Sequence, residues 1–338
     1  MNAAPTDDEL RTRLEAALSS HEGTAVAVTE LARRQCEYRT SFALEELDVT
    51  LADGRSLRLM FKDLSRACLG ADALLVKPGF LHDPVREVEV YRDLLDGAGL
   101  GTPAYYGSSV DPAADRHWLF IENVAGPVLW QVGEFDVWEE SARWLARLHA
   151  TLAPAAAAPP ASLLRYGPDL YRTWIERARS FAERPSTPWS DDTRATVMDL
   201  STRYEPVVER LAALHPTIVH GEFYPSNVLV QHPEGAVRIA PIDWEIAGVG
   251  PGLLDLAALT IGKWTPSQRD ALAQAYREAA EAGTAADTIP ADFDVALDCC
   301  RLHLAVQALG SAPEWQPPAE HRHDWLAESV RIAEELRL

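Results

Sequence analysis

A short β-type interruption in a helical stretch carries the residue types that phosphate and metal chemistry needs. It begins at His220-Gly221-Glu222, runs through a loop to Asn227 and ends at Asp243. Two strands are expected inside it, over residues 228–231 and 237–242, with a turn over 233–235. Because antiparallel strands joined by a tight turn place their outer ends side by side, Asn227 and Asp243 should share one spot, with Glu222 in the loop leading there. An amide oxygen and carboxylates suit a hard cation, which keeps some water for substrate phosphates.

The elements that must position these groups divide into a strand-rich first part and a helical second part. Residues 6–9 (Thr-Asp-Asp-Glu) form a capping box that opens a helix. An Asp-Gly turn at 53–54 joins two strands of alternating polarity, 47–51 and 57–61, and a further strand is expected over 118–124. Long helices are expected over residues 135–152, 191–214, 266–282, 292–309 and 323–336.

This pattern predicts an α+β protein with three parts. Residues 1–23 form an N-terminal helix. Residues 24–124 form a small N-lobe built on an antiparallel sheet. Residues 125–338 form a larger helical C-lobe, which carries the loop around Glu222.

Composition excludes several classes of function. The 338 residues include 51 acidic and 31 basic side chains, a formal net charge of -20, whereas nucleic-acid binding and docking on anionic lipid both need a basic face. Four cysteines, with Cys299 and Cys300 adjacent, give neither a disulfide framework nor a zinc spacing. No apolar run reaches the ~20 residues of a membrane span, and the first residues do not read as a signal peptide. We therefore expect a cytoplasmic protein without nucleic-acid or membrane partners, and nothing in the sequence fixes the oligomeric state.

In its ordered motifs the sequence resembles the aminoglycoside phosphotransferase family, the small-molecule branch of the protein-kinase-like fold. Those enzymes carry a His-Gly-Asp-x-x-x-x-Asn loop, then Ile-Asp-Trp-Glu, a Gly/Pro turn and Asp-Leu-Ala. The counterparts here are His220-Gly221-Glu222 through Asn227, Ile242-Asp243-Trp244-Glu245, Gly250-Pro251-Gly252 and Asp255-Leu256-Ala257. Upstream pieces that agree are Phe61-Lys62, Glu87-x-x-x-Tyr91, the hinge-like segment 120–124 and the helical segment 145–149. The resemblance spans roughly residues 36–282 and is specific as an ordered set.

The resemblance implies a bilobal kinase-like fold and a transfer of the γ-phosphate of ATP, with magnesium, to a hydroxyl. It implies that Lys62 holds the α- and β-phosphates and that a helix carboxylate fixes this lysine. Glu87 is the better candidate than Glu89, because it flanks the apolar stripe at four-residue spacing from Tyr91 while Glu89 lies on the solvent face. Lys62 itself lies on the strand face opposite Phe61.

For the remaining positions the resemblance implies roles around the metal and the base. Asn227 and Asp243 would ligate magnesium, and Glu245 is either a second magnesium contact or only a loop carboxylate. The adenine would meet backbone groups near Glu122 and Val124. Two residues are expected to give structural support, His220 by orienting the loop backbone and Asp255 by bracing the loop.

One residue departs from the family pattern. The loop aspartate, which would accept the proton of the attacking hydroxyl, is Glu222 in this chain. The extra methylene shifts the carboxylate by up to ~1.5 Å, and a misplacement of about 1 Å can cost on the order of a hundredfold in rate. Either the acceptor pocket is set back, or the protein is a slow kinase or a catalytically weak ATP-binding protein. A hydrolase using Glu222, Asp243 and Glu245 is a further alternative, but it leaves Lys62 without a role.

The acceptor is expected to be a small hydroxylated molecule, cationic or sugar-containing, because a strongly acidic protein concentrates cations near its surface. A Ser or Thr hydroxyl on a peptide is the alternative. Candidate acidic groups after the hairpin are Asp270, Glu278, Glu281, Asp292, Asp294, Glu314 and Asp324. Candidate stacking aromatics are Trp264, Tyr276, Trp315 and Trp325.

Overall fold

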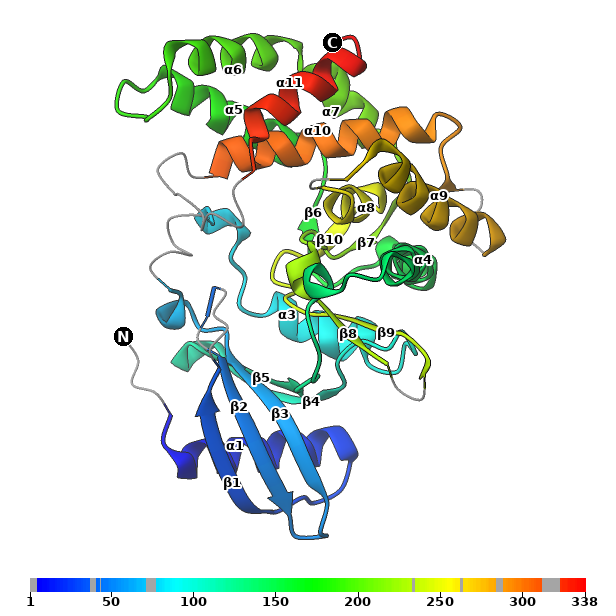
Figure 1. Ribbon diagram of the computed structural model, residues 1–338. Helices are drawn as coiled ribbons and strands as arrows, with labels where there is room; N and C mark the ends of the chain where they lie inside the picture. The colour runs from blue at the N-terminus through cyan, green and yellow to red at the C-terminus, as the bar shows by residue number, and fades with distance from the viewer. Residues whose placement is uncertain are drawn as a thin grey trace. The chain divides into compact units, whose positions relative to one another are not determined.

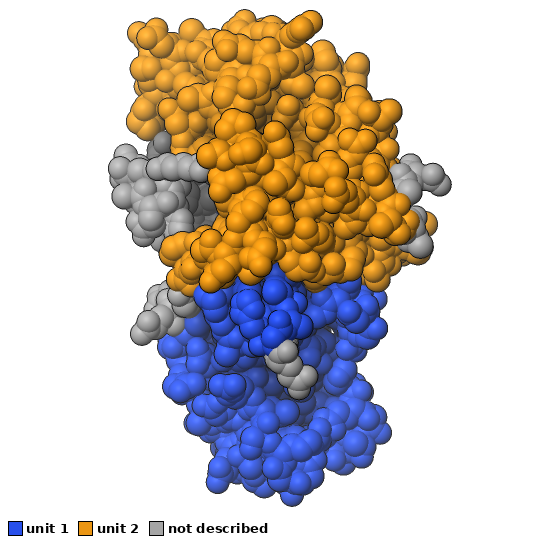
Figure 2. All heavy atoms as spheres, turned by 45° about the vertical axis from the view of Figure 1, so that its right-hand side comes forward, with its two compact units in different colours: residues 1–127, 229–245 blue, residues 128–228, 246–338 orange. Residues whose placement is uncertain are grey.

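The computed structural model describes residues 5–36, 41–42, 44–70, 77–232, 235–261, 264–283, 288–311 and 323–338. The chain forms two compact units, shown in separate colours in Figure 2. Unit 1 comprises residues 1–127 and 229–245, and unit 2 comprises residues 128–228 and 246–338. This division differs from the three predicted parts in two ways. The N-terminal helix belongs to unit 1, and so does the segment 229–245, which lies well beyond the predicted boundary at residue 124. Glu314 and Trp315, two of the candidate acceptor residues, lie outside the described residues.

Unit 1 is built on a five-stranded antiparallel sheet with the strand order β1-β2-β3-β5-β4 (Figure 1). Its strands are β1 (Val28–Gln35), β2 (Leu44–Leu51), β3 (Ser56–Asp63), β4 (Tyr105–Asp111) and β5 (Arg116–Glu122). Its helices are α1 (Asp7–Glu22) and the one-turn α3 (Arg86–Glu89), which continues as π-helical turns over Val90–Leu95. The predicted hairpin of β2 and β3 is present, and the sheet agrees with the predicted α+β class.

The N-cap half of the predicted capping box is present at the start of α1. The hydroxyl of Thr6 accepts a hydrogen bond from the backbone N–H of Glu9, and the helix ends at Gly23 with a left-handed φ of 68°. Leu10, Leu14 and Leu18 are buried on one helix face and join the core formed by one face of the sheet. α1 therefore covers this face, and the functional side chains of the sheet must lie on the other.

Strand β3 places its lysine on that other face. Leu59 and Phe61 point into the core with α1, whereas Lys62 alternates to the opposite side, where it is buried. Lys62 is paired with Leu119 of β5 and with Leu44 of β2, so it stands on an interior strand of the sheet. This pairing fixes the backbone from which the lysine projects.

The segment 229–245 belongs to unit 1 because it binds the end of β5. It contains most of β8 (Val228–Gln231) and all of β9 (Arg238–Pro241), which pair in a two-stranded sheet. The guanidinium of Arg238 binds the carboxylate of Glu122 with a shortest distance of 2.6 Å and donates to the carbonyl of Gly101. The backbone N–H of Val230 donates to the carbonyl of Pro127. These bonds carry the residues after β9 to the sheet of unit 1.

Unit 2 is mainly helical, with a small three-stranded sheet in the order β6-β10-β7 (Figure 1). Its helices are α4 (Phe135–Leu152), α5 (Pro168–Glu183), α6 (Asp191–Arg203), α7 (Glu205–Ala212), α8 (Leu253–Leu259), α9 (Pro266–Ala282), α10 (Phe293–Ser311) and α11 (Trp325–Glu335). Its strands are β6 (Leu164–Arg165), β7 (Pro216–Val219) and β10 (Gly248–Pro251). α10 packs against α5, α8 and α11 and so forms much of the core.

The predicted helix over 191–214 is divided into α6 and α7. The break falls at Tyr204, two residues before Pro206, which has no N–H to donate to the preceding turn. Tyr204 is buried there and its hydroxyl lies 2.7 Å from Nδ1 of His303. Within the described residues, no helix is both long and apolar enough to cross a membrane.

His303 gives a prediction for stability against pH. Burial lowers the pKa of this imidazole to about 3, while in the unfolded chain it is about 6.5. Below pH 6.5 the unfolded state therefore binds a proton that the folded state refuses, and the free energy of unfolding should fall by about 1.4 kcal/mol per pH unit from this group. His303→Gln keeps an acceptor for Tyr204 but does not titrate.

Denaturant unfolding at pH 7 and pH 4 measures this effect. Between these values the wild-type protein should lose about 3 kcal/mol more stability than His303→Gln. Equal losses in the two proteins would mean that His303 is not the group that titrates.

Candidate active site

Unit 1 holds a buried cluster of opposite charges centred on Lys62. The Nζ atom of Lys62 donates to both carboxylate oxygens of Glu87, at 2.7 and 2.8 Å, and to Oδ1 of Asp243 at 3.2 Å. The exposed fractions of the three side chains are 5%, 2% and 6%. The predicted pairing of Lys62 with Glu87, rather than with Glu89, is present. Asp243 joins the pair as a third member.

Three elements bring these side chains together: β3, α3 and the turn that follows β9. Glu87 is the second residue of α3, and its Oε1 also accepts from the backbone N–H of Trp244 at 3.4 Å. Asp243 has a left-handed φ of 71°, which is uncommon for a residue with a side chain. Such backbone strain persists only where the surrounding contacts fix it, and it is concentrated at functional sites.

The cluster sets the charge state of its members. Burial alone lowers the pKa of Lys62, but the carboxylates of Glu87 and Asp243 outweigh burial and raise it, so the lysine stays charged. Burial likewise raises the pKa of Asp243, but Lys62 and Lys77 more than compensate and hold it below its usual range. An ionised carboxylate and a fixed ammonium are therefore available for metal and phosphate.

Glu245 extends the cluster by one carboxylate. Its Oε2 lies 2.6 Å from the Nζ of Lys77, while its Oε1 is buried and, within the described part of the chain, has no hydrogen-bond partner. Burial and the charge of Asp243 raise the pKa of Glu245, although the charges of Lys77 and Lys62 oppose this shift. An oxygen without a donor, next to a second carboxylate, is a setting that a cation would stabilise.

A magnesium ion fits this donor set. Among the residues that the structure describes, no group of three or more His, Cys, Asp or Glu side chains could hold a metal by itself. Magnesium, however, is usually held by one or two carboxylates together with substrate phosphates and water. Asp243 and Glu245 supply such a pair.

Unit 2 holds the loop that begins at His220, and a buried aspartate fixes its backbone. Asp255 of α8 accepts from the backbone N–H groups of His220 and Gly221, both at 2.8 Å, and its Oδ2 lies 3.0 Å from Nε2 of His149. Gly221 has a φ of 85°, and a Cβ atom there would come within 2.3 Å of the hydroxyl of Tyr166. Only glycine fits this position without displacing its neighbours.

The same loop carries Glu222 and Asn227. The backbone N–H of Glu222 donates to Nδ1 of His220 at 3.2 Å, so this histidine contacts the loop backbone. The amide nitrogen of Asn227 donates to the carbonyl of Glu222 at 3.0 Å. This bond uses the nitrogen of the amide, so the oxygen is the atom that Asn227 can offer to a cation.

The predicted hinge residues lie at the end of β5. The carboxylate of Glu122 binds Arg238 and also accepts from the backbone N–H of Ala104 at 3.1 Å. Its own backbone N–H donates to the carbonyl of Ala104. Val124 is buried beside it. The side chain of Glu122 therefore anchors the hairpin of β8 and β9, and its part in binding adenine stays a prediction.

Sequence reasoning did not identify two groups that touch the cluster. Lys77 precedes a Pro-Gly pair in a segment without periodicity, and Arg86 donates to the carbonyls of Leu81 and Glu245. For Arg86 the one signal was its position next to Glu87, as the first residue of α3; Lys77 lies nine residues earlier and gave no signal. Their contacts with Glu245 join positions 168 and 159 residues apart, which no local pattern reveals.

Comparison with known proteins gives the same family as the resemblance found in the sequence. The model of the phosphotransferase enzyme family, APH, matches residues 77–288. No curated protein sequence matches the chain significantly. Among solved structures, a choline kinase from Cryptosporidium parvum Iowa II has a TM-score of 0.57 at 13% identity, over 91% of this chain and 90% of that one. A macrolide 2'-phosphotransferase from Brachybacterium faecium has a TM-score of 0.54 at 18% identity, over 92% and 98%.

A third solved structure, the microcompartment-associated aminopropanol kinase, has a TM-score of 0.56 at 15% identity, over 90% of each chain. At these identities the structural likeness shows a kinase-like fold, in agreement with the predicted class. The family match covers well over half of the chain, including the segments that hold Glu87, the loop at His220 and Asp243. The chain thus belongs to the phosphotransferase enzyme family and is a phosphotransferase that acts on a hydroxyl group.

Proposed function

We propose that this protein transfers the γ-phosphate of ATP, with magnesium, to a hydroxyl of a small cationic or sugar-containing acceptor. The observation that carries the proposal is the sharing of Lys62 between Glu87 and Asp243, beside a buried oxygen of Glu245 that has no donor among the described residues. A hydrolase built on the carboxylates alone would give this ordered lysine no role. Phosphoryl transfer gives it one, because the reaction depends mainly on positioning and on neutralising charge.

In this proposal unit 1 holds the nucleotide. Lys62 binds the α- and β-phosphates, and Glu87 keeps its ammonium in place between two carboxylate oxygens. Asp243 and Glu245 hold magnesium, which when bound neutralises charge on the phosphate oxygens. Backbone groups near Glu122 and Val124 bind the adenine.

In the same proposal the loop of unit 2 serves the acceptor. Glu222 accepts the proton of the attacking hydroxyl, and Asn227 gives its amide oxygen to magnesium. His220 and Asp255 act through the loop backbone, since each is bonded to it. The order of residues along the chain supports a common role in phosphate transfer for the nucleotide residues of unit 1 and the loop residues of unit 2. Strand β8 follows Asn227 directly, and Asp243 comes two residues after β9.

A cationic acceptor is supported by charge and by the relatives of the fold. The net charge of the chain is -20. Solved structures of similar fold include kinases named for choline, ethanolamine and aminopropanol, and an aminoglycoside 2'-phosphotransferase in complex with GDP. Two of the acidic side chains proposed to bind a cationic acceptor give weaker support, because each is already paired with an arginine. Glu281 pairs with Arg277, and Asp292 pairs with Arg210. Tyr276 is buried against His149 and is not a stacking surface for an acceptor.

Mass spectrometry of reaction mixtures tests the proposal. A panel of amino alcohols, aminoglycosides, macrolides, neutral sugars, acidic sugars and Ser/Thr peptides would be incubated with ATP and magnesium, and products searched for one added phosphate. We expect phosphate on a cationic or neutral small molecule. A clear preference for an acidic acceptor or a peptide would contradict the proposed acceptor class.

Ionic strength gives a separate prediction for the electrostatic argument. For a cationic acceptor, kcat/KM should fall by about tenfold from low to high salt, because ions screen the attraction of the acidic protein. A neutral acceptor of similar size serves as the control and should change little. A salt-insensitive rate with the cationic acceptor would remove the charge argument while leaving the phosphotransferase assignment in place.

A further inference from the structure

Beyond the effect of Lys77 on the pKa of Asp243, the pairing of Lys77 with Glu245 has no part in the roles assigned so far. The two side chains are 21% and 10% exposed, and the distance between Nζ and Oε2 is 2.6 Å. Lys77 is thus held on the same carboxylate that has its other oxygen buried without a donor among the described residues. Within unit 1 the pair lies next to Asp243, whose pKa it influences. Lys77 is therefore part of the electrostatic environment of the candidate metal ligands.

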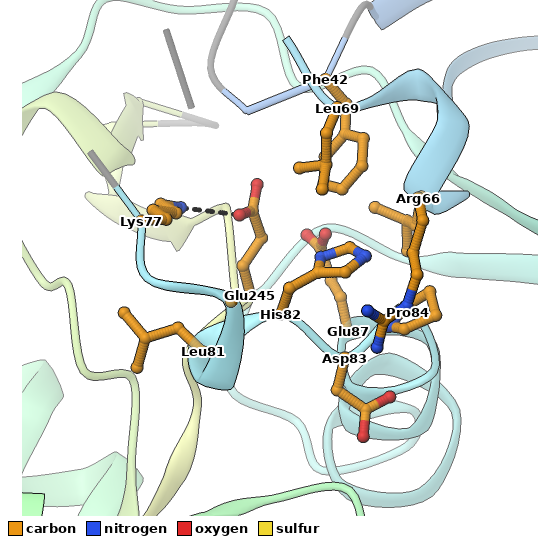
Figure 3. A pocket seen from close by; sticks show the side chains of 12 residues that line it. Phe42, Arg66, Leu69, Lys77, Leu81, His82, Asp83, Pro84, Glu87 and Glu245 are labelled. Carbon is orange, nitrogen blue, oxygen red and sulfur yellow. Dashed lines mark hydrogen bonds and ion pairs between the residues drawn. The ribbon is translucent and has the colours of Figure 1, made fainter. Parts of the chain in front are cut away.

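The pair also lines a cavity within unit 1. The cavity has a volume of about 180 Å³, several times the space of a water molecule, which is about 30 Å³. Figure 3 shows Lys77 and Glu245 bonded to one another in its wall, with Glu87 and His82 nearby. Arg66 reaches the cavity from another part of the wall. The cavity wall thus contains the bonded pair of Lys77 and Glu245.

A divalent cation bound to Glu245 would weaken the ion pair between this carboxylate and the ammonium of Lys77. A cation on Glu245 and Asp243 would repel the ammonium, whereas the phosphates that accompany the cation would attract it. Lysine is suited to such an exchange, because its charge is a compact group on a flexible four-carbon stem. Charge-assisted bonds to phosphate are among the stronger hydrogen bonds in proteins.

We propose that Lys77 is a phosphate-binding residue that neutralises Glu245 before the nucleotide arrives and then exchanges this carboxylate for the terminal phosphates. The proposal rests on the proposed function, since it requires the phosphates to bind beside Asp243 and Glu245. It assigns Lys77 two partners in turn. Loss of its charge should therefore have opposite effects on nucleotide and on metal.

Binding measurements on Lys77→Met test this assignment without using activity. ATP binding in EDTA, followed by calorimetry, should weaken about tenfold, the equivalent of one charge-assisted hydrogen bond. Binding of Mn²⁺ alone, followed by electron paramagnetic resonance, should tighten several-fold, because the competing cation has gone. Lys77→Arg keeps the charge and should preserve both affinities to within about threefold.

Arg66→Met is the matched control, because it removes a positive charge from the same cavity wall without touching Glu245. It should leave the Mn²⁺ affinity within about twofold of the wild type. Unchanged affinities in Lys77→Met, or a loss of both ATP and Mn²⁺ binding, would overturn the exchange and leave a merely structural ion pair. Failure of the wild-type protein to bind ATP with magnesium would overturn the proposed function, and with it the role of Lys77.

Discussion

Replacing Asp243 with asparagine should abolish phosphoryl transfer, with a loss in kcat of about a thousandfold or more. The change removes the charge that Lys62 contacts at 3.2 Å and, in the proposed function, a ligand of magnesium. Asparagine is the informative substitution, because it tolerates the left-handed φ of 71° at this position better than alanine does. Asp243→Ala should be equally inactive. Lys62→Ala should also cut the rate severely.

Turnover at saturating ATP and magnesium, with circular dichroism to confirm folding, measures these effects. Glu89→Gln is the matched control, since Glu89 is on the same helix as Glu87 but does not bond to Lys62 in the described cluster. It should retain nearly full activity. Near-normal turnover of both Asp243→Asn and Lys62→Ala would show that the active site lies elsewhere.

Replacing Glu222 with glutamine should lower kcat by about a hundred- to ten-thousandfold, the range typical of a general base. The affinity for ATP should stay within about threefold of the wild type, because Glu222 is proposed to contact the acceptor and not the nucleotide. Glutamine keeps the size of the side chain. The loop backbone, fixed through Asp255 and His220, is not altered.

Single-turnover kinetics on a good acceptor separates this loss of chemistry from slow product release. An unchanged single-turnover rate in Glu222→Gln would remove the residue from the reaction. Glu222→Asp adds a test of length: it should lose about a hundredfold, because a carboxylate drawn back by about 1 Å no longer meets the hydroxyl. A gain in rate with aspartate would instead favour the alternative of a catalytically weak protein.

The parts of the fold with strong local patterns were predictable from the sequence. The bounds expected for two helices, 135–152 and 266–282, are those of α4 and α9. Apolar spacing marks both helices, and α9 also begins with a capping box at Thr265. The family resemblance implied that Lys62 pairs with a helix carboxylate, and the apolar stripe on the helix favoured Glu87 over Glu89 for this role. Elements with weak patterns were not predicted. β1 is largely exposed, so it offers no alternation to read.

The features that the sequence did not predict depend on contacts between residues far apart in the chain. Pro206 was visible in the sequence, but the burial of Tyr204 at the break and its contact with His303 of α10 were not. The helix of Glu87 starts at Arg86 and passes into π-helical turns, which have no simple sequence period. Lys77 and Glu245 meet only because the segment after β9 returns to unit 1. Such meetings depend on the tertiary fold and on no residue type by itself.

The return of residues 229–245 to the first unit sets the order in which the protein can be finished on the ribosome. Its first 127 residues leave the ribosome without the strand that carries Arg238 and without Asp243. At about 5–20 residues per second, synthesis needs on the order of ten seconds to reach residue 245. During that time Lys62 can pair with Glu87 but not yet with Asp243. The carbonyl of Gly101 and the carboxylate of Glu122, which Arg238 later binds, are still exposed to water. A chain terminated anywhere between these points would carry an incomplete first unit, exposed to chaperones and proteases.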